Sequence, residues 1–133
     1  MNIRAIYTPE VISSTEDEML SDAAQRMAAS EVSSLAVTRE GEVIGILTER
    51  DLVQSMADEV SPKRTHVSAY MTRSPYVLDI DSDSNAAAQR MIDLGVRHLP
   101  VVENGNVVGI VSARDLLVLE TWPGELSSTR RGS

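Results

Sequence analysis

Apolar residues change their spacing from one segment of the chain to the next. Two aliphatic residues at Val11-Ile12 predict a short strand, and between Leu20 and Ala28 apolar residues recur every three or four positions, as on one face of an α-helix. The stretch SLAVTREGEVIGIL (34–47) has aliphatic segments on either side of Glu40-Gly41, which predicts a β-hairpin. TERDLVQSMA (48–57) predicts a helix directly after it. The expected order is strand, helix, strand, strand, helix.

The same order of elements is predicted a second time. PYVL (75–78) predicts a strand, and the apolar spacing from Ala87 to Ile92 is again that of a helix. HLPVVENGNVVGIV (98–111) predicts a hairpin around Asn104-Gly105, a dipeptide typical of type I′ turns. SARDLLVLE (112–120) predicts the last helix.

An internal repeat with a constant offset of 64 positions accounts for this recurrence. GILTERDL at 45–52 returns as GIVSARDL at 109–116, and AAQRM at 23–27 returns at 87–91. Each copy of such a repeat is usually one supersecondary unit, so two copies predict one domain made of two halves about a pseudo-twofold axis. We expect a first half at 1–60, a linker at 61–66, a second half at 67–120 and a flexible C-terminal tail at 121–133.

Composition and charge exclude several classes of function. The chain has 133 residues, within the usual size of one domain. It has no cysteine, which excludes disulfides, thiolate nucleophiles and cysteine-ligated metals. The net charge of −8 argues against nucleic-acid binding, which depends on phosphate neutralisation by Lys and Arg. No apolar run approaches the roughly 18 residues of a membrane span, and none has signal-peptide character, so we expect a cytoplasmic protein without a membrane partner.

The repeated hydroxyl and aspartate have two compatible interpretations. Thr48 with Asp51, and Ser112 with Asp115, stand between a strand and a helix, where a capping box belongs. A cap contributes about 0.5 to 2 kcal/mol, which is enough to explain one such motif. The alternative is a ligand site, because each pair follows a buried strand and a short carboxylate can accept two hydrogen bonds from a ribose diol. Both interpretations can hold together.

The combined motifs resemble the cystathionine β-synthase (CBS) domain in two copies. The resemblance is carried by VSAYMT (67–72), QRM (89–91), VRHLPV (96–101), and by the hairpins that run into GILTERD and GIVSARD. The second half matches best. The first half departs from the pattern at Tyr7, where the family usually has Met, and at SSLAV, which replaces RHLPV.

A tandem CBS pair, or Bateman module, implies both a fold and a ligand. The fold is of the α/β (α+β) class, with two pseudo-symmetric β-α-β-β-α halves packed through their sheets. The implied ligand is an adenosyl compound such as AMP, ADP, ATP or S-adenosylmethionine, bound in clefts between the halves, with no obligatory cofactor and no metal. The resemblance assigns the ribose to Thr48, Asp51, Ser112 and Asp115. It assigns the adenine base to Val11, Ile12, Tyr76 and Val77.

The two halves differ at the residues expected to meet phosphate. Arg97 and His98 of the second half stand where the first half has Ser33 and Ser34. In a chain of net charge −8, phosphate binding needs local cations, and a guanidinium offers bidentate donors. We therefore assign the ligand phosphate to Arg97 and His98 and expect unequal clefts. The alternative, left open by the sequence, is a solvated Arg97 and a packed His98.

The expected function is that of a stand-alone regulatory module, which binds an adenosyl ligand and signals to an unidentified partner protein. No motif for a nucleophile, an acid–base pair or a metal cluster is present, so we expect no enzymatic activity. The alternative is a ligand-free module for dimerisation or protein interaction. Apolar residues in the last helix (LLVLE, 116–120) favour association, and the family typically pairs as flat dimers, so we expect a homodimer.

Overall fold

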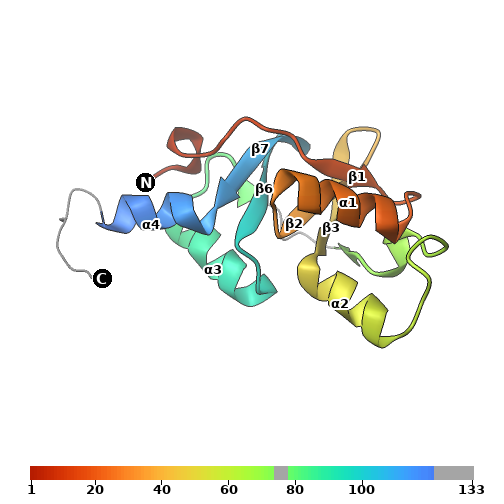
Figure 1. The fold of residues 1–133 in the computed structure, drawn as a ribbon. Helices are drawn as coiled ribbons and strands as arrows, with labels where there is room; N and C mark the ends of the chain where they lie inside the picture. The colour runs from red at the N-terminus through yellow and green to blue at the C-terminus, as the bar shows by residue number, and fades with distance from the viewer. Residues whose placement is uncertain (74–77, 122–133) are drawn as a thin grey trace.

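The computed structural model describes residues 1–73 and 78–121 and confirms the expected order of elements. The elements are η1 (Ile3–Ala5), β1 (Ser13–Thr15), α1 (Leu20–Ser30), β2 (Ser34–Arg39), β3 (Glu42–Thr48), α2 (Glu49–Ala57), η2 (Val67–Ala69), β4 (Thr72–Arg73), β5 (Leu78–Asp79), α3 (Ser84–Leu94), β6 (His98–Glu103), β7 (Asn106–Ser112) and α4 (Ala113–Thr121). Leaving aside the short η1, η2 and β4, each half is β-α-β-β-α, as the repeat predicts (Figure 1).

Both predicted hairpins form, and both turn at the predicted residues. Glu40 and Gly41 have φ values of 51° and 84°, and Asn104 and Gly105 have 53° and 84°. Positive φ at both central residues defines the type I′ turn, whose twist matches that of the flanking strands. The first strand was placed too early by the sequence: β1 begins at Ser13, after Val11-Ile12, because the pairing with β2 starts at Ser13 opposite Ala36.

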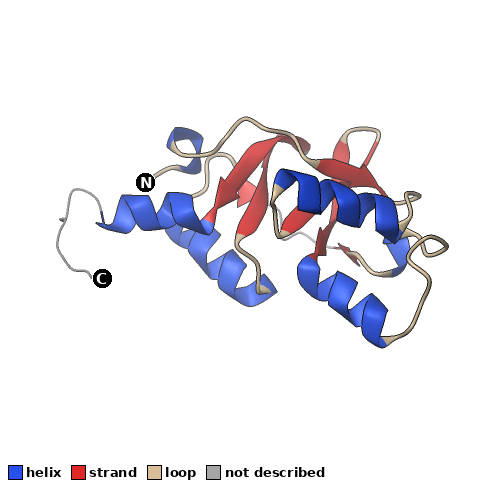
Figure 2. Ribbon diagram, in the orientation of Figure 1, coloured by secondary structure: helices blue, strands red, loops and turns tan. Residues whose placement is uncertain are grey.

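One seven-stranded sheet joins the two halves. Its strands follow the order β1-β2-β3-β7-β6-β5, and β4 pairs with β3 outside that path. The two hairpins meet where Glu42 of β3 pairs with Asn106 of β7. Figure 2 shows the strands in the interior, with α1 and α2 beside one half and α3 and α4 beside the other. The expected packing of two pseudo-symmetric halves through their sheets is confirmed.

The halves exchange their N-terminal segments. Thr8, from the first repeat, pairs with Ile110 of β7, and Thr72, from the second repeat, pairs with Ile46 of β3. Both pairs obey the 64-residue offset, so the exchange is symmetric. In Figure 1 the N-terminal segment with η1 accordingly lies beside β7 and α4, away from α2. Each half thus borrows a strand-like segment from the other.

The hydrophobic cores follow the exchange. The core beneath α3 contains Leu78, Met91 and Leu99 of the second half together with Ile3, which is fully buried. The core beneath α1 correspondingly contains Val67, also fully buried. We call the first the α3 core and the second the α1 core. A residue of one repeat can therefore belong to the hydrophobic core of the other half.

Candidate functional site

Both repeated phrases fold as the predicted capping boxes. In α2 the backbone N–H of Thr48 donates to Oδ2 of Asp51 (2.9 Å), and the N–H of Asp51 donates to Oγ1 of Thr48 (3.2 Å). In α4 the N–H of Ser112 donates to Oδ2 of Asp115 (2.9 Å), and the N–H of Asp115 donates to Oγ of Ser112 (3.1 Å). These reciprocal bonds start each helix and fix both carboxylates at the ends of β3 and β7.

Each capping carboxylate keeps acceptor capacity. Within residues 1–73 and 78–121, the second oxygen of Asp51 and of Asp115 accepts no hydrogen bond from the protein. Both residues are half-buried. Burial raises the pKa of Asp51, although its hydrogen bonds with Thr48 and the charge of Arg50 oppose that rise. A half-buried carboxylate with a free oxygen can accept hydrogen bonds from a hydroxylated ligand.

The N-terminal ends of β2 and β6 meet where the two halves contact each other. Ser33, which is 1% exposed, receives the backbone N–H of Arg97 on its Oγ (2.9 Å). Its own N–H donates to Nδ1 of His98 (3.1 Å), and its Oγ lies 3.0 Å from the same nitrogen. Ser34 donates its hydroxyl to the carbonyl of His98. Ser33 and Ser34 occupy the positions in the first half that Arg97 and His98 occupy in the second. The two serines thus hydrogen-bond to their own counterparts in the repeat.

His98 is held as a neutral, packed side chain in this arrangement. An Nδ1 that accepts the Ser33 N–H carries no proton. Burial lowers the pKa of His98, and the neighbouring Arg97 charge lowers it further, while Glu49 and Asp115 act in the opposite direction. Of the two interpretations that the sequence leaves open for His98, this geometry agrees with the packed side chain.

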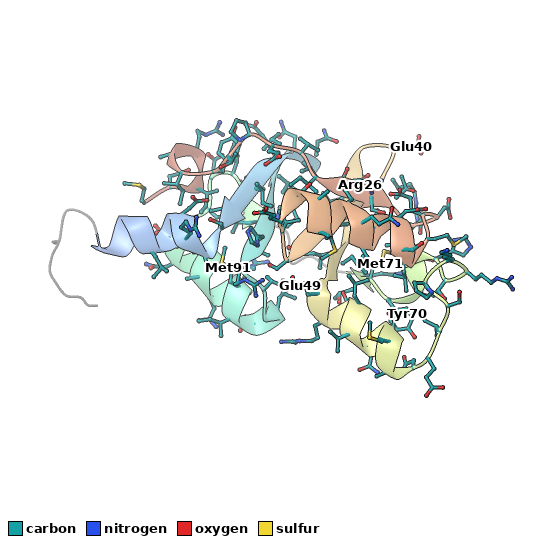
Figure 3. The ribbon with its side chains drawn as sticks, viewed as in Figure 1. Arg26, Glu40, Glu49, Tyr70, Met71 and Met91 are labelled. Atoms are coloured by element: carbon teal, nitrogen blue, oxygen red, sulfur yellow. The ribbon has the colours of Figure 1, made fainter. Side chains whose placement is uncertain are left out.

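Arg97 extends from the second half to the first. Its guanidinium pairs with Glu49, the first residue of α2, at 3.2 Å between Nη2 and Oε1. Figure 3 shows Glu49 at the end of α2 that faces α3. The guanidinium of Arg97 thus pairs with the residue that follows Thr48, whereas its backbone carbonyl receives the N–H of Ala113, the residue that follows Ser112 (2.7 Å).

Each half has one groove between its two helices, and Arg97 lines both grooves. The first, of about 420 Å³, is lined by Ala24, Met27, Val32, Leu52, Glu49 and Arg97. The second, of about 450 Å³, is lined by Ala88, Met91, Val96, Leu116, Leu117 and Arg97. Eight of these residues form four pairs under the 64-residue offset: 24 and 88, 27 and 91, 32 and 96, and 52 and 116. The grooves are thus a repeated feature, with one shared cation between them.

The other predicted ligand residues have different surroundings. Ile12 is 7% exposed and packs in the α1 core, whereas Val11 is 58% exposed. Tyr76 and Val77 lie outside the described residues. Sequence reasoning missed Glu49 and did not assign a role to Ser33. Both stand where the repeat is broken, opposite Ala113 and Arg97, and that break was the available signal.

Neither a metal cluster nor a membrane span is found in the described part of the chain. Among residues 1–73 and 78–121, no three His, Asp or Glu side chains gather in a way that could hold a metal ion. Within the same ranges, no helix has the length and apolar character needed to cross a bilayer.

Comparison with known proteins identifies the family. The family model of the CBS domain matches the sequence twice, at residues 3–58 and at residues 67–120. The chain belongs to the CBS domain family, as a tandem pair. The family could be predicted from the repeated motifs, and the resemblance noted on the sequence is confirmed.

Relatives with this pair occur in proteins of different length. The CBS domain-containing protein CBSCBSPB2 of Arabidopsis thaliana is 33% identical over 82% of the chain, which spans 21% of that protein. An uncharacterized protein of Methanopyrus kandleri is 32% identical over 92% of the chain, which spans 64% of that relative. The chain thus corresponds to about a fifth of the Arabidopsis relative.

Solved CBS structures share the whole fold. The CBS-domain containing protein ATU1752 of Agrobacterium tumefaciens is similar with a TM-score of 0.78 and 28% identity, covering 91% of this chain and 100% of that one. The CBS domain pair of protein MJ0100, solved in complex with methylthioadenosine and S-adenosyl-L-methionine, is similar with a TM-score of 0.77 and 23% identity, covering 90% and 95% of the two chains. At that identity the second likeness concerns the fold alone.

Proposed function

We propose that the chain is a regulatory module that binds an adenosyl ligand between its halves and transmits binding to a partner protein. One observation carries the proposal: two equivalent half-buried carboxylates, Asp51 and Asp115, each have one oxygen fixed by a cap and one available to a ligand. A ribose diol supplies the hydroxyl donors that such an oxygen accepts. That protein MJ0100 holds adenosyl compounds on the same fold supports this choice of ligand class.

The proposal gives the remaining predicted residues the following parts. Thr48 and Ser112 join their aspartates at the ribose, and apolar residues at the start of each half (Val11, Ile12, Tyr76 and Val77) enclose the base. Arg97 contacts the phosphate in the cleft of the first half. His98 is neutral in the structure, so it adds charge to phosphate binding only if it gains a proton when the phosphate is bound. Ligand binding between the halves shifts their packing by no more than its differential affinity for the two arrangements allows.

Thermal unfolding in the presence of nucleotides tests this function. AMP, ADP, ATP, methylthioadenosine and S-adenosylmethionine would each be added to the purified chain. A ligand at 100 times its dissociation constant adds about 2.7 kcal/mol to the free energy of unfolding. We expect a clear rise in Tm with at least one of them, and its loss in the pair of variants Asp51→Asn and Asp115→Asn.

Asn is the suitable replacement because it keeps an oxygen for the capping N–H while losing the charge. Asp83→Asn is the matched control: Asp83 caps the N-terminus of α3, where its Oδ2 receives the N–H of Asn85 (3.0 Å), outside the proposed site. Failure of all five compounds to change Tm would favour the alternative function, a ligand-free module for protein interaction.

We further propose that two copies associate through their helices. Large apolar side chains are exposed on three of them: Val53 (66%), Met56 (78%), Ile92 (72%) and Leu117 (62%). They lie on the helices that border the two grooves, and exposed apolar groups of this size are typical of interaction surfaces.

Sedimentation velocity tests this surface, and we expect the wild type to be a dimer. Ile92→Glu should raise the dissociation constant of the dimer by at least about tenfold. Val11→Glu, which charges an exposed apolar site outside the helices (58% exposed), should leave the dimer intact. Equal behaviour of the two variants would contradict this surface.

A further inference from the structure

An ion pair between the halves occurs at two positions where the repeat is broken together. Arg97 replaces the serine found at position 33, and Glu49 replaces the alanine found at position 113. Beside the first capping box the chain therefore has both members of the pair, whereas the equivalent positions, 33 and 113, hold serine and alanine. The side chains of Arg97 and Glu49 are 65% and 53% exposed, so both are open to exchange with solutes.

The contact places the Arg97 guanidinium at the start of α2, where the proposed function puts the ligand phosphate. Glu49 is the first residue of α2, between Thr48 of the capping box and Asp51. A substituent at the 5′ position of a ribose bound to Asp51 extends only a few ångströms. The Arg97 guanidinium comes from the opposite half, and its Nη2 is already occupied by the Glu49 carboxylate at 3.2 Å.

We propose that Glu49 is an internal competitor of phosphate: its carboxylate occupies Arg97 until the phosphate of an adenosyl ligand displaces it. This inference rests on the proposed function and names the residue that sets its preference among ligands. A phosphorylated ligand that binds Nη2 of Arg97 must first break the pair with Glu49. A ligand without phosphate does not touch the pair, and its affinity is independent of Glu49.

The physical chemistry of exposed charges makes the exchange feasible. An exposed ion pair has a small net free energy, because both groups are well hydrated when apart. A phosphate has more charge and more acceptor oxygens than a carboxylate, so it can replace Glu49 on a guanidinium. The released carboxylate then repels the phosphate at short range, which lowers affinity more for ATP than for AMP. Because Glu49 and Arg97 belong to different halves, this exchange also removes one contact between them.

Calorimetric titration of AMP and methylthioadenosine into four variants tests the proposal. Glu49→Gln should bind AMP about three- to tenfold more tightly than the wild type, and methylthioadenosine within about twofold. Glu31→Gln is the matched control: Glu31 lines the same groove and loses the same charge, but it makes no ion pair with Arg97. Its affinity for AMP should stay within about twofold of the wild type. In Arg97→Gln, the additional change Glu49→Gln should give less than half of the gain, in free energy, that it gives in the wild type.

The outcomes separate this proposal from the one on which it rests. If methylthioadenosine binds and Glu49→Gln leaves AMP affinity unchanged or weaker, Glu49 is not a competitor, and adenosyl binding stands. An undiminished gain in the Arg97→Gln background would show simple repulsion and also overturn competition. If neither compound binds to any variant, the competition proposal is wrong, and the thermal test with all five compounds then decides the proposed function.

Discussion

Replacing Ile3 with alanine is expected to lower the free energy of unfolding by about 2 to 5 kcal/mol, the usual cost of truncating a buried isoleucine. The size of the effect is unexpected for a residue so near the end of a chain, where substitutions are generally tolerated. Ile3 is 0% exposed and packs in the α3 core, which belongs to the other repeat. Its removal should leave a cavity beneath α3. Denaturation by urea would measure the loss.

The exchange of segments also predicts where the damage occurs. Native-state hydrogen exchange should show lost protection in β6 and β7, and less change in β2 and β3, although Ile3 belongs to the first repeat. Val67→Ala provides the reciprocal case, with an expected cost of about 2 kcal/mol and greater effects in β2 and β3. Val11→Ala is the control, because Val11 is 58% exposed. A loss for Ile3→Ala of less than about 1 kcal/mol would contradict its place in the core.

Replacing Gly109 with alanine should cost about 1 to 3 kcal/mol, as overpacking of a filled site does. Gly109 lies on β7 against the segment supplied by the first repeat: a Cβ at this position would overlap the carbonyl oxygen of Thr8 and come within 2.5 Å of the Tyr7 ring. To relieve the overlap, the exchanged segment must move away from β7. Thermal and urea unfolding of the variant would measure the cost.

The sign of this effect is informative. In an open strand, Gly→Ala would stabilise the protein by about 0.4 to 1 kcal/mol, because alanine restricts the unfolded chain. Gly45→Ala is the matched comparison in the other half, where the closest atoms are the Thr72 carbonyl oxygen at 2.7 Å and Sδ of Met71 at 3.3 Å. We expect a smaller loss there, since the overlap with the carbonyl oxygen is smaller than the one at Gly109 and the methionine side chain can move. Stabilisation by Gly109→Ala would show that the Thr8 segment is not held against β7.

Much of the fold could be predicted because its determinants are local. The hairpin turns need positive φ at two successive residues, and Asn104-Gly105 is a dipeptide that readily adopts this conformation. The capping boxes likewise depend on two residues three positions apart, so Ser112 and Asp115 suffice to predict one. A constant offset of 64 then shows that the two halves are equivalent.

The parts that could not be predicted depend on which half each segment contacts. The offset equates Thr8 with Thr72, but it is satisfied equally whether each pairs within its own repeat or with the other. The contacts of Ser33 with Arg97 and His98 have the same origin, because they cross the pseudo-twofold axis. For that reason the sequence identified Arg97 but not the acid that pairs with it, Glu49.

The exchange of N-terminal segments makes each repeat depend on the other. A single repeat, expressed alone, would have no partner to receive the segment around Ile3 and no segment to cover the β-strand at Gly45 or Gly109. A second identical copy would satisfy both needs at once, by the reciprocal swapping that produces symmetric dimers. The tandem chain is therefore geometrically equivalent to a swapped dimer of two repeats. Unlike the identical subunits of such a dimer, the two repeats can differ at the axis, where serine contacts histidine and arginine pairs with glutamate.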